Sequence, residues 1–377
     1  MAIPYRADHI GSLLRPPELL QARVDHQQGR LTLEQLRQRE DQAILQALQL
    51  QRQVGLGIFT DGEYRRGWFA GAFEESVEGL TLDSDAVADR RWQGQHNELA
   101  NTTSADLRLV QRVVGAKLRQ VRRLTAHESG FLQQHAPGPF KITMPGVMTR
   151  AMAWYKPGLT DQFYPTQADL VQELVGILQR EVRALLDEGV SYIQLDSLHY
   201  VIRLADAGYR QRMIEAGKDP DQELDDTIAA DNASLQDARR AGVTVGLHMC
   251  RGNNRSAWIS EGGYDATAEK AFNCLEVDRF LLEYDTARAG GFEPLRFVPQ
   301  GKTVVLGLIS SKEPQLESQD QLRRRIDEAA KYVPLENLAL SPQCGFASTA
   351  PGNMLTWDEQ RRKLELVVET ARKVWGE

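Results

Sequence analysis

The chain has 377 residues, 42% of them hydrophobic, which is enough to build a large buried core. Its formal net charge of −7 at pH 7 argues against a nucleic-acid-binding protein. No apolar run approaches the roughly eighteen residues that would span a bilayer, so no membrane segment is predicted. The N-terminal segment also lacks the apolar stretch of a signal peptide.

Short apolar segments alternate with amphipathic helical patterns along the chain, which is typical of β–α units around a parallel sheet. Eight segments are predicted to be strands: 7–13, 57–63, 140–145, 191–196, 243–250, 279–284, 303–309 and 338–344. Helical patterns cover 33–53, 165–188, 221–240, 264–275, 318–332 and 356–374. This pattern predicts an α/β fold, a (β/α)₈ TIM barrel forming one domain over 1–377, with a doubly wound sheet as the alternative.

Two regions hold more chain than a standard barrel needs. An N-terminal helical extension is predicted over 14–54, and an insertion after the second strand over 70–139. Within the insertion, 106–121 fits a β-hairpin and 125–135 fits a helix. Both regions are interpreted as elaborations of the one domain.

Polar or reactive residues follow one predicted strand after another. Active sites of such barrels lie at the carboxyl ends of the strands, so these residues are expected around one mouth. They are Ser12, Asp61, Glu63, Asp196, His248, Cys250, Glu283 and Cys344.

The segment "GVTVGLHMCRGNNRS" ends a predicted strand on two possible metal ligands. His248 and Cys250 are two positions apart, so their side chains point to the same side of the strand. Glu283 and Cys344 end two other strands and would meet them at the mouth. An imidazole, two thiolates and a carboxylate suit tetrahedral Zn²⁺. Burial of each cysteine in the core is the structural alternative.

The third cysteine, Cys274, lies inside a helical pattern and is predicted to be a core residue. An odd, sparse set of cysteines without a signal peptide indicates a reducing compartment, where thiols serve metals or catalysis. A cytoplasmic location is therefore predicted.

Six motifs together resemble the catalytic half of cobalamin-independent methionine synthase. They are "HIGSL", "DGE", "IQLD", "LHMCRGN", "FLLEYD" and "SPQCGFAS". The chain is similar, over nearly its whole length, to short single-barrel proteins named 5-methyltetrahydropteroyltriglutamate–homocysteine methyltransferase-like. The resemblance implies a (β/α)₈ barrel that binds zinc and methylates homocysteine to methionine, as in methionine biosynthesis.

The resemblance also implies roles for individual residues. The family's zinc ligands correspond to His248, Cys250, Glu283 and Cys344, the four residues that the strand ends already indicate. The family's contacts to the amino acid part of homocysteine correspond to Ile10, Gly11, Ser12, Glu63 and Asp196. Glu63 and Asp196 would bind the ammonium through charge-assisted hydrogen bonds, and Ser12 the carboxylate. A cap or ion-pair role for the two acidic residues is the structural alternative.

The methyl-donor side departs from the family pattern. The chain holds one predicted barrel rather than the two of full-length methionine synthases. Lys312 stands where the family has a histidine implicated in protonating the folate leaving group, so it is a candidate acid, or else a solvated loop lysine. The family's folate-stacking tryptophan has no obvious counterpart, and Trp154 is a candidate by proximity alone.

These departures leave the methyl donor open among a methylated folate, a methylated corrinoid carrier protein and a small methyl compound. Two other functions stay open: an epoxyalkane–coenzyme M transferase-like enzyme that adds a thiol to an epoxide, and a non-catalytic zinc- or thiol-binding protein. A homo-oligomer is a further expectation.

Overall fold

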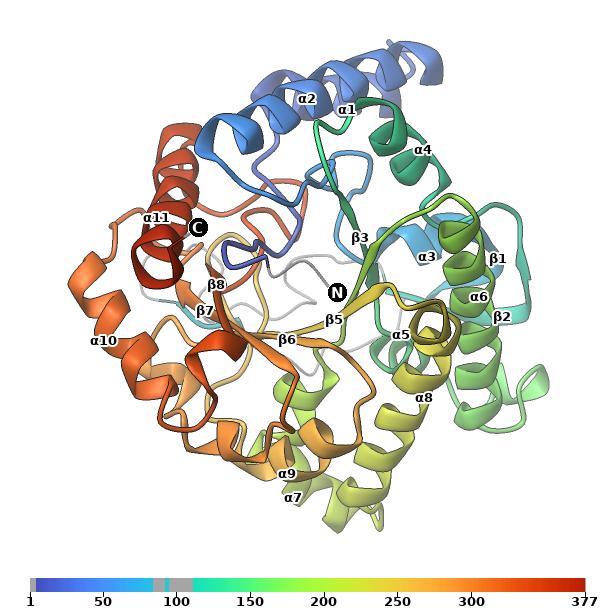
Figure 1. Cartoon of the computed structure of the whole chain (residues 1–377). Coiled ribbons are helices and arrows are strands. Elements are labelled where there is room, and N and C mark those ends of the chain that lie inside the picture. Colours follow the sequence, from blue (N-terminus) through green and yellow to red (C-terminus); the bar gives the residue numbers. More distant parts are fainter. Residues whose placement is uncertain (1–4, 84–91, 95–110, 377) are drawn as a thin grey trace.

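The central feature of the fold is a sheet of six parallel strands (Figure 1). The structure is a computed structural model that describes residues 5–83, 92–94 and 111–376. Each strand pairs with the next along the chain: β3 (Lys141–Pro145), β4 (Tyr192–Asp196), β5 (Thr244–Met249), β6 (Arg279–Glu283), β7 (Thr303–Ile309) and β8 (Leu338–Pro342). All their residues except Thr303 are buried, as expected for a parallel sheet covered on both faces. Six of the predicted strands are therefore confirmed.

The other two predicted strands, 7–13 and 57–63, are extended segments that complete the barrel without forming a regular ladder. Ala7 forms a single parallel bridge to Leu340 of β8, and Phe59 forms one to Phe140. The backbone N–H of Leu13 donates to the carbonyl of Gly62 (3.1 Å), so the two segments also contact each other.

Positive φ angles explain why these two segments are irregular. Gly11 has φ 135°, Gly62 has φ 70° and Glu63 has φ 59°. Strand residues need negative φ, so each of these positions interrupts the ladder. The result is an eight-position (β/α) barrel in which the first two positions are bent to present side chains at the mouth.

Helices cover the outside of the barrel (Figure 1). They are α1 (Pro17–Gln27), α2 (Leu33–Val54), α6 (Gln167–Asp187), α8 (Pro220–Ala241), α9 (Asp265–Cys274), α10 (Gln319–Ala329) and α11 (Trp357–Trp375). Three of these helices, α2, α6 and α11, begin with a capping box. In each, the side chain of the N-cap threonine accepts a hydrogen bond from the backbone N–H three residues later; these threonines are Thr32, Thr166 and Thr356. All of these helices except α1 agree with the predicted helical patterns. α1 lies with α2 in the predicted N-terminal helical extension.

The predicted insertion between the second and third strand positions contains a hairpin and two short helices. They are α3 (Gly71–Ser76), β1 (Val77–Asp83), β2 (Gln111–Gln120) and α4 (Ala126–His135), with β1 and β2 antiparallel. The predicted helix is confirmed. The prediction of a hairpin within 106–121 was wrong, because Gln111–Gln120 is one continuous strand and its antiparallel partner is β1, much earlier in the chain. Residues 106–110 of the predicted hairpin lie outside the described residues.

Several short helical elements lie between the strands and the longer helices. They were not predicted, because they are too short to show a helical period in the sequence. They are α5 (Val147–Trp154), α7 (Ala207–Glu215), the π-helical turn η2 (Tyr200–Leu204), and the 3₁₀ turns η1 (Thr160–Gln162), η3 (Ala287–Ala289), η4 (Glu293–Phe297) and η5 (Leu335–Asn337). Within the described ranges, no helix has both the length and the apolar character needed to cross a membrane.

A buried carboxyl on α8 makes the stability of the fold depend on pH. Asp231 is fully buried and accepts a hydrogen bond from the Tyr200 hydroxyl (2.9 Å). Burial raises the pKa of Asp231 to about 7. The folded protein therefore holds a proton that the unfolded chain releases at lower pH, and stability falls as pH rises toward that pKa.

We expect wild type to lose about 2 kcal/mol of unfolding free energy between pH 5.5 and pH 8.5 relative to Asp231→Asn. Asparagine keeps an acceptor for Tyr200 and does not ionise. Urea denaturation at both pH values measures the difference, and Asp226→Asn, an exposed change on the same helix, should follow wild type. Equal pH dependence in wild type and Asp231→Asn would contradict the prediction.

Candidate metal and substrate site

Three potential metal ligands meet where two strands end. His248 lies in β5, Cys250 follows that strand directly, and Cys344 follows β8. The ligand atoms of the three residues lie within 4.8 Å of one another, and all three side chains are buried. The two Sγ atoms are 3.6 Å apart, far beyond the roughly 2.05 Å of a disulfide, so both thiols are free. Three of the four predicted ligands are thus brought together.

The imidazole of His248 is oriented for binding a metal through Nε2. Its Nδ1 lies 3.0 Å from the carbonyl oxygen of Leu281, its neighbour in the β5–β6 register. A protonated Nδ1 donates to that carbonyl, which leaves a lone pair on Nε2. Nε2 is buried and has no hydrogen-bond partner within the described part of the chain. The thiol of Cys344 is its polar neighbour, so the nitrogen is available to a ligand held between His248 and the two thiols.

The two thiols titrate as a pair. The hydrogen bond between the two thiols holds the pKa of Cys344 well below its ordinary value, and His248 acts in the same direction. The same contact, together with burial, raises the pKa of Cys250 well above its ordinary value. The pair therefore favours one thiolate and one thiol, and a cation would be needed to hold two thiolates together.

The fourth predicted ligand, Glu283, ends β6 but lies outside this group of three. Its Oε2 accepts from the backbone N–H of Arg251 (2.6 Å), and its Oε1 accepts from the guanidinium of Arg288 (2.8 Å). The side chain is fully buried. A ligand role for Glu283 stays a prediction.

Glu63 is a buried carboxylate of the mouth, and one of its oxygens is available. Its Oε1 accepts from the Thr143 hydroxyl (2.7 Å) and lies 3.6 Å from Nη1 of Arg66. Its Oε2 is buried and without a hydrogen-bond partner among the residues described. The left-handed φ of 59° costs roughly 1 kcal/mol or more for a non-glycine residue, and such strain concentrates at functional positions.

Asp196 is the second buried carboxylate of the mouth. It ends β4 opposite His248 in the register and accepts from the Gln194 amide (2.8 Å). Burial raises its pKa to about 7, and the nearby Glu63 adds to that shift. Burial also raises the pKa of Glu63. Two buried carboxylates that disfavour each other's charge form a site suited to a cation.

The segment Ile10–Gly11–Ser12 closes this side of the site. The Gln194 amide also donates to the carbonyl of Ile10 (2.8 Å). A Cβ atom at Gly11 would lie 2.8 Å from the Thr143 methyl carbon and 3.3 Å from Oε1 of Glu63, so only glycine fits there. Ser12 is buried, and its Oγ lies 3.4 Å from the backbone nitrogen of Ala347. The structure therefore brings all five predicted substrate-binding residues to the metal cluster's side of the barrel.

Lys312 is buried beside the cluster rather than solvated. Its ammonium donates to the carbonyl of Gly252 and to Oδ1 of Asn253, each at 2.9 Å. The Asn253 amide in turn donates to the carbonyl of Gly345 (2.7 Å). Lys312 thus links the loops that follow β5, β7 and β8, and the alternative of a solvated loop lysine is wrong.

Other candidates lie away from the chemistry. Trp154 is 1% exposed and packs edge-to-face on Phe73, so it is a helix-packing residue and not a stacking surface. Cys274 is exposed at the end of α9, so the prediction of a core cysteine was wrong: the last helical turn faces outward there. His199, which follows β4, is hydrogen-bonded to Glu223 (2.7 Å).

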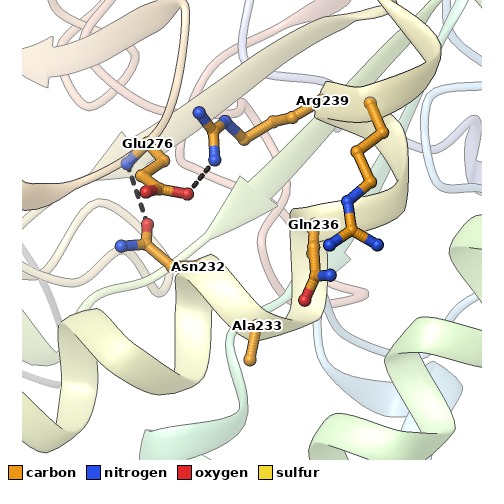
Figure 2. A pocket seen from close by; sticks show the side chains of 6 residues that line it. Asn232, Ala233, Gln236, Arg239 and Glu276 are labelled. Carbon is orange, nitrogen blue, oxygen red and sulfur yellow. Dashed lines mark hydrogen bonds and ion pairs between the residues drawn. The ribbon is translucent and has the colours of Figure 1, made fainter.

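A surface pocket also lies away from the mouth (Figure 2). It is lined by the C-terminal half of α8 and by Glu276, which precedes β6. Glu276 pairs with Arg239, and its backbone N–H donates to Asn232 (2.8 Å). Since β6 runs from Arg279 to Glu283, this pocket is at the opposite end of the strand from the metal cluster.

Four residues of the site were not predicted from the sequence: Thr143, Gln194, Arg66 and Arg288. Gln194 could have been found, since it shares a strand face with Asp196. Arg66 also pairs with Glu128 of α4, and that contact could not be foreseen because it joins a loop to the insertion.

Comparisons with known proteins cover nearly the whole chain. The family model for the catalytic domain of cobalamin-independent synthase matches residues 6–373. The chain is 38% identical to the uncharacterized protein YxjG of Bacillus subtilis, over 99% of this chain and 95% of that protein. It is 23% identical to the methionine synthase of Pyrococcus abyssi, over 89% of this chain and 85% of that one.

Among solved structures, a candidate vitamin-B12-independent methionine synthase from Listeria monocytogenes is similar over 100% of both chains, with a TM-score of 0.72 and 27% identity. The matched residues 6–373 include every element that carries the site described above.

Proposed function

The chain belongs to the cobalamin-independent methionine synthase family of methyltransferases, and on that premise we propose that it is a zinc-dependent enzyme that methylates homocysteine to methionine. One observation carries the proposal. A buried cluster of an imidazole and two thiols lies beside two buried carboxylates, Glu63 and Asp196, at one barrel mouth. The cluster suits a thiol-activating metal, and the carboxylates suit the ammonium of an amino acid.

The donor set fits zinc. Two Zn–S bonds of about 2.3 Å at a tetrahedral angle would place the sulfurs about 3.8 Å apart, close to the 3.6 Å between Cys250 and Cys344. His248 offers Nε2 to the same place, and soft thiolates with an imidazole select zinc among abundant cations. Bound zinc would supply a deprotonated substrate thiol that stays nucleophilic. Glu283 is the proposed fourth and most weakly held ligand.

The remaining residues bind and orient the amino acid. Oε2 of Glu63 and the carboxylate of Asp196 would accept from the homocysteine ammonium. Ser12 and the backbone around Gly11 would hold its carboxylate. Because these contacts fix the amino acid against the cluster, the substrate sulfur is positioned for in-line attack on a methyl group.

We propose Lys312 as the residue on the donor side. Its buried ammonium has three donors, two of which serve Gly252 and Asn253. The third could donate to a leaving group and pass it a proton.

We also propose a cytoplasmic location for the protein, because free thiols that serve a metal persist in a reducing compartment.

The identity of the methyl donor is the least constrained part of the proposed reaction, and one experiment with a panel of donors tests it. Methionine formation is measured with methylfolates of different tail lengths, methylcobalamin with candidate corrinoid carrier proteins, and small sulfonium or thioether donors. We expect weak or absent turnover with polyglutamylated methylfolate and better turnover with another donor, because the departures from the family lie on the donor side.

Lys312→Ala should lower turnover with the preferred donor by about 100-fold or more, the usual range for a lost proton donor, while exposed Lys331→Ala should not. Fast turnover with methylfolate alone, abolished by Lys312→Ala, would contradict the donor prediction and make this lysine the replacement for the family histidine. No turnover with any donor, despite bound homocysteine, would favour a binding protein.

A further inference from the structure

The carboxylate of Glu283 is held by a partly buried arginine, Arg288, that contacts a second carboxylate as well. Nη2 of Arg288 donates to Oε1 of Glu283 (2.8 Å) and to Oδ1 of Asp285 (3.0 Å). The side chains of Glu283 and Asp285 are at most 1% exposed, and that of Arg288 is 9% exposed. One guanidinium therefore serves two acidic residues inside the protein, immediately beside the metal cluster.

The position of Arg288 does not depend on Glu283. Its guanidinium carbon lies 4.6 Å from the ring centre of Trp258, a cation–π contact. Trp258 is itself fixed, since its backbone exchanges two hydrogen bonds with Gln93 (3.0 and 2.8 Å). With Trp258 and Asp285 as partners, Arg288 would stay in place if the Glu283 carboxylate moved away.

A carboxylate that leaves a metal inside a protein needs another partner. An unpaired carboxylate inside a protein is strongly unfavourable, so a ligand without a second partner would resist displacement. Glu283 has such a place: Arg288 binds one oxygen, and the backbone N–H of Arg251 binds the other (2.6 Å).

Resting on the proposed function, we infer that Arg288 is a positioning residue that receives the Glu283 carboxylate when a substrate thiol takes its place on the metal. Arg288 then competes with the metal for Glu283. This competition weakens metal binding in the resting protein and eases the entry of the thiol. Arg288 touches neither the thiol nor the methyl group.

Arg288→Gln tests the inference through two binding measurements. Zinc affinity, measured by competition with a chromophoric chelator, should rise about tenfold, the value of one hydrogen bond to a charged group. Homocysteine affinity, measured by the sulfur-to-metal band of the cobalt-substituted protein, should fall about tenfold for the same reason. Both shifts should disappear when Arg288→Gln is made in a Glu283→Gln background, because glutamine carries no charge for Arg288 to hold.

Arg296→Gln, on an exposed residue eight positions along the chain, is the matched control and should change neither affinity. Unchanged affinities in Arg288→Gln, or equal shifts with and without Glu283, would overturn the inference. If Arg288→Gln does not fold, Arg288→Lys should give smaller shifts in the same directions, and no shift in that variant would overturn it equally.

The zinc measurement needs no homocysteine, so the two proposals fail separately. A wild-type protein that binds zinc but no homocysteine contradicts the proposed function. A zinc shift that depends on Glu283 would still support the role of Arg288 in such a protein.

Discussion

Cys250→Ser and Cys344→Ser should each purify with most of the metal missing, whereas wild type should carry about one zinc per chain. Serine is a much poorer zinc ligand than a thiolate, and its ionisation in a buried site is costly. Even residues outside the ligand shell change metal affinity by roughly 10- to 100-fold, so loss of a ligand should exceed about 100-fold. Methyl transfer should fall in parallel, because the free thiol of homocysteine is mostly protonated at neutral pH.

Metal content by mass spectrometry and zinc affinity by chelator competition measure this effect. Cys274→Ser is the matched control, since it makes the same change at an exposed cysteine away from the mouth. Removing the metal from wild type with a chelator should reproduce the loss of activity, and added zinc should restore it. Full zinc retention in both Cys250→Ser and Cys344→Ser would contradict the prediction that these cysteines bind zinc and would indicate that they are core-packing residues.

Glu63→Gln and Asp196→Asn should each weaken homocysteine binding by about 10- to 150-fold, the range for one hydrogen bond to a charged group, without loss of zinc. The two carboxylates have raised pKa values because they are buried and close together, and an ammonium would relieve both effects. The change in the cobalt spectrum on adding homocysteine measures the affinity. Glu78→Gln, at an exposed position on β1, should leave it unchanged.

A second thiol separates the amino-thiol function from its enzymatic alternative. 2-Mercaptoethanesulfonate has no ammonium, so Glu63→Gln should not weaken its binding. It should bind wild type less tightly than homocysteine, because two carboxylates repel a sulfonate. Tighter binding of the sulfonate would favour the epoxyalkane–coenzyme M transferase-like alternative.

The sequence predicted the parts of the site that regular strands position. His248 and Asp196 lie at the carboxyl ends of neighbouring parallel strands, and such ends meet at one mouth of a barrel, so their meeting there could be foreseen. Cys344 ends another such strand. The barrel itself was predictable for the same reason, since each β–α unit carries its own local pattern.

The rest depended on irregular backbone. The positive φ angles of Gly11 and Glu63 turn predicted strands into bent segments, and no periodicity reports this. The contact between Glu283 and Arg288 lies in a loop whose path the sequence does not encode locally. Cys274 was misplaced because a helical pattern does not say which way its last turn faces. Oligomeric state and a corrinoid carrier protein stay predictions.

The bridge between Ala7 and Leu340 has a consequence for how the protein is made. The segment that carries Ile10, Gly11 and Ser12 is synthesised long before its backbone partner in β8. Until β8 emerges, this segment can contact residues 57–63 but lacks the bridge to Leu340. A nascent chain without β8 therefore cannot hold the amino acid site together, and substrate binding begins only after β8 has been made.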